Sequence, residues 1–366
     1  MSGTSIDGID AALIDCSTNP PQLLCTHEHP INQDTREAVA AISQPGDNEI
    51  ERMGVLDRQL GTCFADAARA LLSKAEVATT AVRAIGSHGQ TIRHRPPSAG
   101  THRANSFTLQ IGDPTTIAEL TGITTVADFR RRDIAAGGEG APLAPAFHQA
   151  YFAADGINRA IVNIGGIANI SVLQGKRLLM GFDSGPGNTL MDHWIKQNLG
   201  APFDRDGEWA AGGTPCEESL QVLLSEPYFN KSGPRSTGKE LFNSQWLASK
   251  LPAVESLKPQ NLQATLLELT ARSIALGIKN CSIEMQEVYL CGGGAHNQTL
   301  LKRLAAELAP ASVGSTLALG LHPDWVEAVT FAWLAQQTLA GLPGNAPAVT
   351  GASGERVLGA IYPAGN

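Results

Sequence analysis

Short β-type segments and amphipathic helical segments alternate along most of this 366-residue chain. Apolar side chains recur at helical spacing in residues 57–72 and 264–278, which predicts helices with one buried face. Between such segments lie brief runs rich in β-branched residues, for example residues 9–15, 107–111 and 124–127. Regular alternation of this kind is typical of sheets covered by helices. The sequence therefore predicts the α/β class.

The second half of the chain opens with the clearest hairpin signal. Residues 160–164 and 168–173 are β-rich runs joined across Gly165-Gly166, a pair that suits a tight primed turn. Each half of the chain begins with a glycine turn followed by a strand. Two related lobes would explain this repetition, and chance would explain it equally well.

The length of the chain corresponds to about two domains of ordinary size. Residues 135–142 have the composition of a loop and mark one candidate boundary. We expect an N-terminal lobe formed by residues 1–133 with residues 345–366, and a C-terminal lobe formed by residues 134–344.

Composition and charge exclude several classes of protein. Hydrophobic residues make up 43% and charged residues 17% of the chain, which supports large cores and argues against disorder. The net charge of −8 disfavours nucleic acid as a partner, and no apolar window is long enough for a membrane span. The N-terminus lacks the pattern of a signal peptide, and the six cysteines are far apart without a CxxC pair. We expect a soluble, cytoplasmic enzyme with reduced thiols.

Three glycine-rich turns are candidates for binding phosphate: residues 2–8, 163–166 and 291–297. Glycine lets backbone N–H groups approach an anion closely because it carries no Cβ atom. The chain lacks GxxxxGK[ST], which excludes a P-loop, and lacks GxGxxG, which weakens a dinucleotide-binding interpretation. Each turn taken alone is more simply a structural turn. All three together, at strand ends in both halves, favour ATP as a ligand.

Asp183 is the candidate catalytic carboxylate. It lies in the stretch GFDSGPGN, residues 181–188, which we interpret as a loop between a short apolar run and a helix over residues 189–197. A carboxylate held there is placed to take a proton from water or from a sugar hydroxyl during phosphoryl transfer. The alternative from local sequence is that Asp183 caps the helix or a turn.

Two polar clusters have the side chains of a ligand site. Residues 87–95 are dense in groups that hydrogen-bond sugars, and residues 128–133 carry three guanidinium groups that suit a carboxylate or phosphate, although a solvated surface is the alternative. Glu327 begins a helix predicted over residues 325–339, either as a ligand or as a favourable charge at the helix start. The nine histidines show no metal-binding pattern, so we expect any Mg²⁺ to arrive with a nucleotide.

An ordered series of motifs resembles the anhydro-N-acetylmuramic acid kinase family from end to end. The motifs are MSGTSIDGID, IGSHGQTIRH, QIGDP, ADFRRRDIAAGGEGAPLAPAFH, NIGGIANIS, FDSGPGNTLMD, STGKELFN, QATLLELTARSI, CGGGAHN and LGAIYP. The resemblance implies the actin/hexokinase/Hsp70-like ATPase superfamily, in which two ribonuclease-H-like lobes close over ATP in a cleft between them.

The resemblance also implies a reaction. The family converts 1,6-anhydro-N-acetylmuramate, ATP and water into N-acetylmuramate 6-phosphate and ADP during recycling of the bacterial cell wall. Water attacks C1, the bridging O6 leaves, and O6 attacks the γ-phosphate. The family's catalytic aspartate corresponds to Asp183, which would deprotonate the attacking water. A homodimer is expected from the family.

Further site residues follow from matching the motifs. The residues that would bind the nucleotide are Gly3, Thr4, Ser5, Ile6, Asp7, Gly8, Ile9 and Asp10 in the first phosphate loop, Asn163, Gly165 and Gly166 in the second, and Gly292, Gly293 and Gly294 on the nucleotide side. The residues expected around the sugar are Gln90, Thr91, Arg131 and Glu327. An arginine at that position would suit the lactyl carboxylate of the substrate.

One departure from the family pattern affects the first lobe. Family members begin with a short apolar strand before MSGTS, so we expect this strand to be missing or shortened here. Two alternatives to the family activity remain open at this point. One is a kinase for another amino sugar or small acid, and the other is a nucleotide-binding regulator with impaired catalysis.

Overall fold

The computed structural model describes residues 1–3, 6, 8–100, 102–231, 233, 235, 237–238, 241–252 and 257–365. The chain forms two compact units. Unit 1 consists of Met1–Tyr151 with Trp325–Asn366, and unit 2 consists of Phe152–Asp324. These limits differ from the lobe boundaries expected from the sequence, because helix α12 (Val326–Leu339) packs on strands of unit 1.

Unit 2 is built on a five-stranded sheet. Its strands are β7 (Asn158–Ile164), β8 (Ile167–Gln174), β9 (Arg177–Pro186), β10 (Glu287–Cys291) and β11 (Ser312–Ser315). The order is β11-β10-β7-β8-β9. Strands β7, β8 and β9 are antiparallel neighbours, whereas β10 runs parallel to β7 and to β11. This is the ribonuclease-H-like arrangement, and it confirms both the α/β class and the hairpin across Gly165-Gly166.

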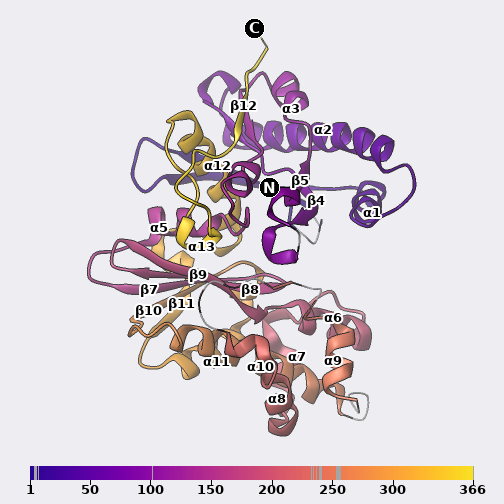
Figure 1. Cartoon of the computed structure of the whole chain (residues 1–366), viewed down its shortest axis with the longest axis vertical. Coiled ribbons are helices and arrows are strands. Elements are labelled where there is room, and N and C mark those ends of the chain that lie inside the picture. Colours follow the sequence, from indigo (N-terminus) through magenta and orange to yellow (C-terminus); the bar gives the residue numbers. More distant parts are fainter. Residues whose placement is uncertain are drawn as a thin grey trace. The chain divides into compact units, whose positions relative to one another are not determined.

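Helices gather on one face of this sheet, as Figure 1 shows. They are α6 (Thr189–Leu199), α7 (Glu208–Ala211), α8 (Glu217–Leu224), α9 (Ser244–Lys250), α10 (Pro259–Lys279) and α11 (Gln298–Leu308). Helix α10 is buried on most of its circumference because it contacts β8 and β9 as well as α6, α7, α8 and α11. Leu300, Leu301, Leu304 and Leu308 recur at helical spacing in the sequence, which predicts a helix over residues 298–308, and α11 has these bounds. The helix predicted over residues 264–278 extends further at its start, where Pro259 occupies the first turn.

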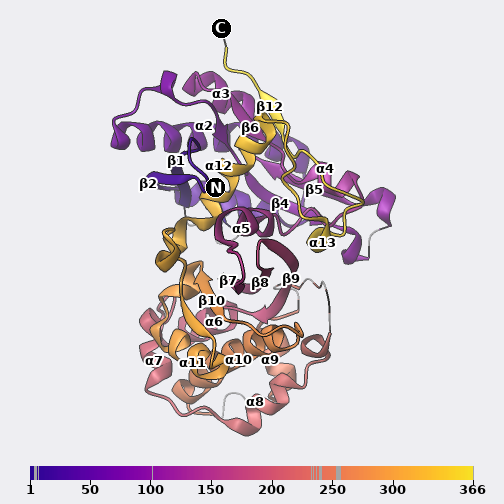
Figure 2. The same ribbon diagram turned by 90° about the vertical axis from the view of Figure 1, so that its left-hand side faces the viewer.

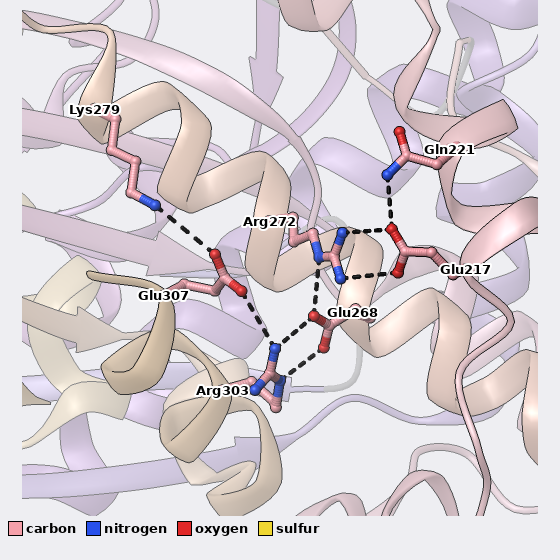
Figure 3. A network of polar contacts seen from close by, with 7 residues as sticks. All are labelled: Glu217, Gln221, Glu268, Arg272, Lys279, Arg303 and Glu307. Carbon is pink, nitrogen blue, oxygen red and sulfur yellow. Dashed lines mark hydrogen bonds and ion pairs between the residues drawn. The ribbon is translucent and has the colours of Figure 1, made fainter. Parts of the chain in front are cut away.

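A network of ion pairs joins three of these helices (Figure 3). Glu268 on α10 has a side chain that is only 4% exposed, and it accepts hydrogen bonds from Arg272 and from Arg303 on α11. Arg272 also holds Glu217 of α8 through two hydrogen bonds of 2.9 and 3.0 Å. Burial would raise the pKa of Glu268, but the hydrogen bonds and charges of Arg303 and Arg272 outweigh this effect and leave the pKa below its usual value.

Unit 1 contains three small groups of strands. Strands β1 (Gly8–Asp15) and β2 (Gln22–Pro30) pair antiparallel, as do β4 (Gln90–Arg95) and β5 (Phe107–Ile111), and β3 (Ile85–Gly86), β6 (Thr125–Ala127) and β12 (Ala360–Tyr362) form the third group in the order β12-β6-β3. Figure 2 shows α12 beside β1 and β6, and contacts with β1, β3 and β6 hold it there.

The remaining helices of unit 1 cover these strands. They are α1 (Gln33–Ile42), α2 (Glu49–Ala75), α3 (Pro114–Thr121), α4 (Arg131–Ala135), α5 (Ala144–Phe152, whose last residue falls in unit 2) and α13 (Pro347–Thr350). The helix predicted over residues 57–72 is the central part of α2. Its apolar face, with Leu60 and Phe64, is buried against residues such as Ile9 and Ile117.

An apolar cavity of about 690 Å³ runs along one edge of β1. Its lining includes every residue of the range 9–15. Successive side chains of a strand point to opposite faces, so a cavity on one face would be lined by every second residue. The unbroken run indicates that the cavity lies beside the edge of the strand. Ile85 and Gly86 of β3 and Ala328 and Ala332 of α12 also line it. Among the described residues the only strand that pairs with β1 is β2, and the only one that pairs with β3 is β6. At the cavity, the backbone of Asp10 exchanges two hydrogen bonds of 2.8 Å with Met1, which also lines it.

Candidate functional site

Two of the glycine turns predicted to bind phosphate lie at the same edge of the unit 2 sheet. Strands β7 and β10 are parallel neighbours, and Cys291 at the end of β10 is in register with Asn163 near the end of β7. Gly165-Gly166 follows β7, and Gly292–Gly294 follows β10. The carboxyl ends of parallel strands are the usual place for a ligand in α/β sheets.

The two turns are in direct contact. A Cβ atom on Gly292 would overlap the Oδ1 atom of Asn163, and Gly292 has a positive φ of 73° that also favours glycine. A Cβ atom on Gly294 would overlap the side chain of Ile164. Glycine at these two positions therefore lets the turn after β10 pack against the end of β7.

The segment after Asp183 docks on the same turns. The backbone N–H of Gly187 donates to the carbonyl of Gly166 at 2.9 Å, and that of Asn188 donates to the carbonyl of Gly165 at 2.8 Å. The side chain of Asn188 donates to the carbonyl of Ile164 at 3.2 Å. The structure thus brings together three motifs that are separated in the sequence.

Two glycines of this assembly have room beside their Cα atoms. A Cβ atom on Gly165 would have no closer neighbour than the carbonyl oxygen of Ile167 at 3.7 Å, and one on Gly293 would have none closer than the Nδ2 atom of Asn188 at 3.9 Å. Neither glycine is required by packing within unit 2. Both leave backbone open to the approach of a phosphate, which is the fit expected of a nucleotide loop.

Asp183 lies on a strand, which corrects the interpretation of residues 181–188 as a loop. Residues up to Pro186 belong to β9, and the helix that follows begins at Thr189. Glycine and proline suggested a turn, but β9 is an edge strand, where proline costs no ladder hydrogen bond. The pairing of β9 with β8 is irregular between Ala168 and Asn169, and Gly185 has a φ of 149°.

Asp183 is half-buried and fixed by residues beyond its own strand. The backbone N–H of Thr237 donates to its carboxylate Oδ2 at 3.0 Å. Its carbonyl accepts hydrogen bonds from the hydroxyl of Tyr228 at 2.8 Å and from Nε of Arg235 at 3.1 Å. The guanidinium of Arg235 lies over the ring of Phe182, 4.8 Å from its centre. A carboxylate with one oxygen held by a backbone N–H has a defined direction.

The first predicted phosphate loop is in unit 1 and is described only in part. Thr4, Ser5 and Asp7 lie outside the described residues. The backbone N–H of Ile6 donates to the carbonyl of Gly3 at 3.3 Å, and Ile6 has a positive φ of 59°, which is unusual for a β-branched residue. The rest of the predicted loop, Gly8, Ile9 and Asp10, belongs to β1.

Gln90 and Thr91 begin strand β4, in a cluster that sequence reasoning did not place on a strand. The β-type alternation is present, because Gln90 and Ile92 are buried while Thr91 is half-buried. The hydroxyl of Thr91 accepts a hydrogen bond from Gln110 at 3.1 Å. The side-chain oxygen of Gln90 is buried and has no hydrogen-bond partner among the described residues. A polar atom in that position is available to a ligand.

Arg131 and Glu327 occupy different environments in unit 1. The side chain of Arg131 is exposed and its Nε lies 3.4 Å from Oδ1 of Asp128. Glu327 lies in the first turn of α12 and keeps access to solvent. The pKa of Glu327 is above its usual value. Loss of solvent around the carboxyl group is the largest cause, and the charge of Asp10 adds to it, whereas the charges of Arg130 and of the N-terminus act in the opposite direction.

His88 and Arg130 form a pair that the sequence analysis did not identify. Nε of Arg130 donates to Nε2 of His88 at 2.8 Å, and Nδ1 of His88 is 2.8 Å from the carbonyl oxygen of Gly89. The pair fixes a neutral imidazole with its proton on Nδ1, since Nε2 must accept. Burial lowers the pKa of His88 well below its usual value, and the charge of Arg130 lowers it further.

Three further observations concern the whole described chain. All six cysteines are free. Within the residues described, no three His, Cys, Asp or Glu side chains gather in a way that would hold a metal ion. None of the described helices is long and apolar enough to cross a membrane.

Comparison with known proteins gives a consistent match over the full length. The family model of anhydro-N-acetylmuramic acid kinase matches residues 1–364. The anhydro-N-acetylmuramic acid kinase of Shewanella loihica (strain ATCC BAA-1088 / PV-4) is 52% identical over 364 residues, which are 99% of this chain and 97% of that protein. The one of Coxiella burnetii (strain Dugway 5J108-111) is 51% identical over 364 residues, 99% of this chain and 96% of that protein.

Among solved structures, the ROK hexokinase from Thermus thermophilus resembles this chain remotely. It is 16% identical, and the match covers 90% of this chain and 99% of that one, with a TM-score of 0.34. That likeness is too remote to bear on fold or function.

Proposed function

Because the chain belongs to the anhydro-N-acetylmuramic acid kinase family, we propose that Asp183 is the base with which this ATP-dependent kinase opens 1,6-anhydro-N-acetylmuramate. The product would be N-acetylmuramate 6-phosphate, formed in the recycling of cell-wall material. The observation that carries the proposal is the docking of Gly187 and Asn188, which directly follow the Asp183 strand, onto the Gly165-Gly166 turn. The candidate base and the candidate phosphate loop are thus parts of one rigid assembly.

The chemistry requires one proton acceptor. Water attacks C1 of the sugar and gives its proton to the Asp183 carboxylate, while the bond between C1 and O6 breaks. The released O6 forms a bond to the γ-phosphorus, and ADP leaves. The hydrogen bond from the backbone N–H of Thr237 to Oδ2 holds the carboxylate in one orientation for this proton transfer.

The nucleotide phosphates would lie on open backbone. Gly165 and Gly293 have room beside their Cα atoms, so their N–H groups suit the approach of phosphate oxygens. Gly166, Gly292, Gly294 and Asn163 would shape the same turns. The first loop, from Gly3 to Asp10, would contribute from unit 1. Mg²⁺ would arrive with ATP and neutralise phosphate charge, held mainly by phosphate and water.

The sugar would be held by side chains of unit 1. The buried oxygen of Gln90 is without a described partner and suits a hydroxyl or amide donor of the sugar. Thr91 would add a hydroxyl, Arg131 would pair with the lactyl carboxylate, and Glu327 would contact a hydroxyl. We also propose a homodimer acting in the cytoplasm, which agrees with the six free cysteines.

An assay of ADP release in water labelled with ¹⁸O tests the function. With ATP and 1,6-anhydro-N-acetylmuramate we expect ADP and a sugar phosphate that carries the label at C1. Ordinary N-acetylmuramate is the control acceptor and should give much slower turnover. Label in the phosphate group would indicate simple ATP hydrolysis, and preference for the ordinary sugar would indicate a different kinase on this scaffold. Binding of both ligands without ADP release would indicate a regulator.

A further inference from the structure

A pocket on unit 1 is lined by three arginines and is made of residues that the proposed function does not use. Its volume is about 370 Å³, and its lining residues are Arg103, Arg132, Ala135, Ala136, Gly137, Ser353 and Arg356. The chain as a whole carries a net charge of −8, so three arginines around one pocket are a local exception. None of the lining residues is acidic.

Within the described part of the chain, the three arginines have no acidic partner. Among the described residues, no carboxylate forms an ion pair with Arg103, Arg132 or Arg356. The carboxylate nearest in sequence to Arg132 is Asp133, which is fully buried and already accepts hydrogen bonds from several groups. Like charges around one pocket without a counter-ion repel one another, and a bound anion would offset that repulsion.

The backbone around the pocket is rigidly connected. Asp133 accepts hydrogen bonds from Asn345 at 2.7 Å, from Thr350 at 2.8 Å and from the N–H of Gly140 at 2.8 Å. These bonds fix residues 345–356 against the end of α4. The N–H of Ser353 also donates to the carbonyl of Ala136 at 2.9 Å, and that of Arg356 donates to Asn345 at 2.7 Å.

Two of the guanidinium groups are also positioned by direct contacts. Arg103 donates to the carbonyl of Gly137 at 3.2 Å, and a Cβ atom on Gly137 would lie 3.2 Å from the Cζ atom of Arg103. Glycine at this position therefore lets the guanidinium lie against the backbone. Arg356 donates to the hydroxyl of Ser353 at 3.2 Å. Arg132 has no side-chain hydrogen bond within the described part of the chain, so its donors remain available.

We propose that this pocket binds a small anion with a phosphate group, such as inorganic phosphate or the phosphate monoester of a sugar. A carboxylate needs one guanidinium, whereas a phosphate dianion with three terminal oxygens satisfies several. The hydroxyl of Ser353 adds a further donor. The inference is independent of the proposed kinase activity, since it concerns other residues and is tested by binding alone.

Isothermal titration and thermal unfolding of the full chain test the site, with inorganic phosphate, glucose 6-phosphate and acetate as probes at constant ionic strength. Saturating ADP is present in every titration so that phosphate does not occupy a nucleotide site. We expect phosphate or glucose 6-phosphate to bind and raise the unfolding midpoint, and acetate to have little effect. The tighter of the two binders identifies the source of the phosphate group.

Arg132→Gln is the decisive variant. The side chain of Arg132 is exposed and makes no hydrogen bond or ion pair within the described part of the chain, so the substitution should not disturb folding. We expect it to weaken phosphate binding about tenfold, and Arg356→Gln to do the same. Arg58→Gln, at an exposed arginine of α2 outside the pocket, is the matched control and should bind as the parent does. Equal binding by the parent and Arg132→Gln, equal loss in Arg58→Gln, or equal binding of acetate would overturn the proposal.

Discussion

The backbone N–H of Thr237 donates to the Oδ2 atom of Asp183 at 3.0 Å, although the two residues are 54 positions apart. This contact joins the FDSGPGN and STGKELFN motifs in space. It also holds the Oδ2 atom of the carboxylate in a fixed direction. A base needs such a fixed orientation because the proton must be taken along the line of attack on C1.

Asp183→Asn is expected to lower kcat by about 10²- to 10⁴-fold, because asparagine keeps an oxygen for Thr237 but accepts no proton from water. Nucleotide binding should stay close to that of the parent. Asp155→Asn, in an exposed ion pair of the same unit, is the control and should leave the rate unchanged. ADP release and calorimetric titration with a nucleotide measure the two effects. A variant that retained half of the parent rate would show that the role is misassigned.

Gly293→Ala distinguishes an effect on the binding of ATP from an effect on the stability of the fold. A methyl group there would meet nothing within the unit closer than 3.9 Å, so the unfolding midpoint should stay within the range of ordinary surface substitutions. The same methyl group would cover backbone that we assign to phosphate, so KM for ATP should rise about tenfold. Steady-state kinetics and thermal unfolding provide the two readouts.

Gly294→Ala is the contrasting variant, since its methyl group would overlap the side chain of Ile164. We expect it to destabilise unit 2 and to lose activity together with structure. If Gly293→Ala left KM for ATP unchanged, the turn after β10 would be a structural element and not a nucleotide loop.

Local signals made part of this architecture predictable. The hairpin across Gly165-Gly166 and helix α11 depend on a turn pair and on a regular apolar spacing, and both were placed correctly. Strand β9 was missed because Gly185 and Pro186 are turn residues in most contexts, and only its position at the sheet edge makes them acceptable in a strand. Which strand lies at an edge is a property of the whole sheet.

The contacts that orient the candidate site were beyond prediction for a related reason. Arg130 and His88 are 42 residues apart, and Thr237 reaches Asp183 from a different segment. No periodicity or spacing links such pairs. The resemblance to a family supplied the identity of Asp183, whereas the direction of its carboxylate required the fold.

His88→Gln is expected to reduce the pH dependence of stability. The pKa of His88 is low in the folded protein and about 6.5 in the unfolded chain, so its contribution is complete above about pH 6.5 and is lost as the pH falls below that value. Glutamine still offers an oxygen to Arg130 but does not titrate. The loss of unfolding free energy between about pH 7.5 and about pH 5 should be smaller than in the parent by about 2 kcal/mol.

Chemical denaturation at the two pH values measures this difference. His193→Gln, at an exposed position of α6, is the control and should keep the pH dependence of the parent. An unchanged pH dependence in His88→Gln would mean that the imidazole accommodates a proton in the folded state and that its bond with Arg130 is easily broken.

Glu268 tests how unit 2 holds its helices together. Its carboxylate is nearly inaccessible and forms ion pairs with both Arg272 and Arg303, so it is the centre of the network in Figure 3. Removing one partner of a buried ion pair leaves the remaining charges uncompensated. Glu307 belongs to the same network but is more exposed, at 26%, and lies 3.3 Å from Arg303 and 3.8 Å from Lys279.

Glu268→Gln is therefore expected to lower the free energy of unfolding of unit 2 by on the order of 2 kcal/mol at neutral pH, and the matched change Glu307→Gln by less than about 1 kcal/mol. Because the pKa of Glu268 is lowered in the folded protein, its stabilisation is present above the unfolded pKa and is lost as the pH falls through the folded pKa. The difference between the two variants should consequently shrink in acid. Urea denaturation across a pH series measures the difference between the free energies of unfolding. Equal losses in the two variants at neutral pH would show that the buried carboxylate stabilises the contact between α10 and α11 no more than the exposed one does.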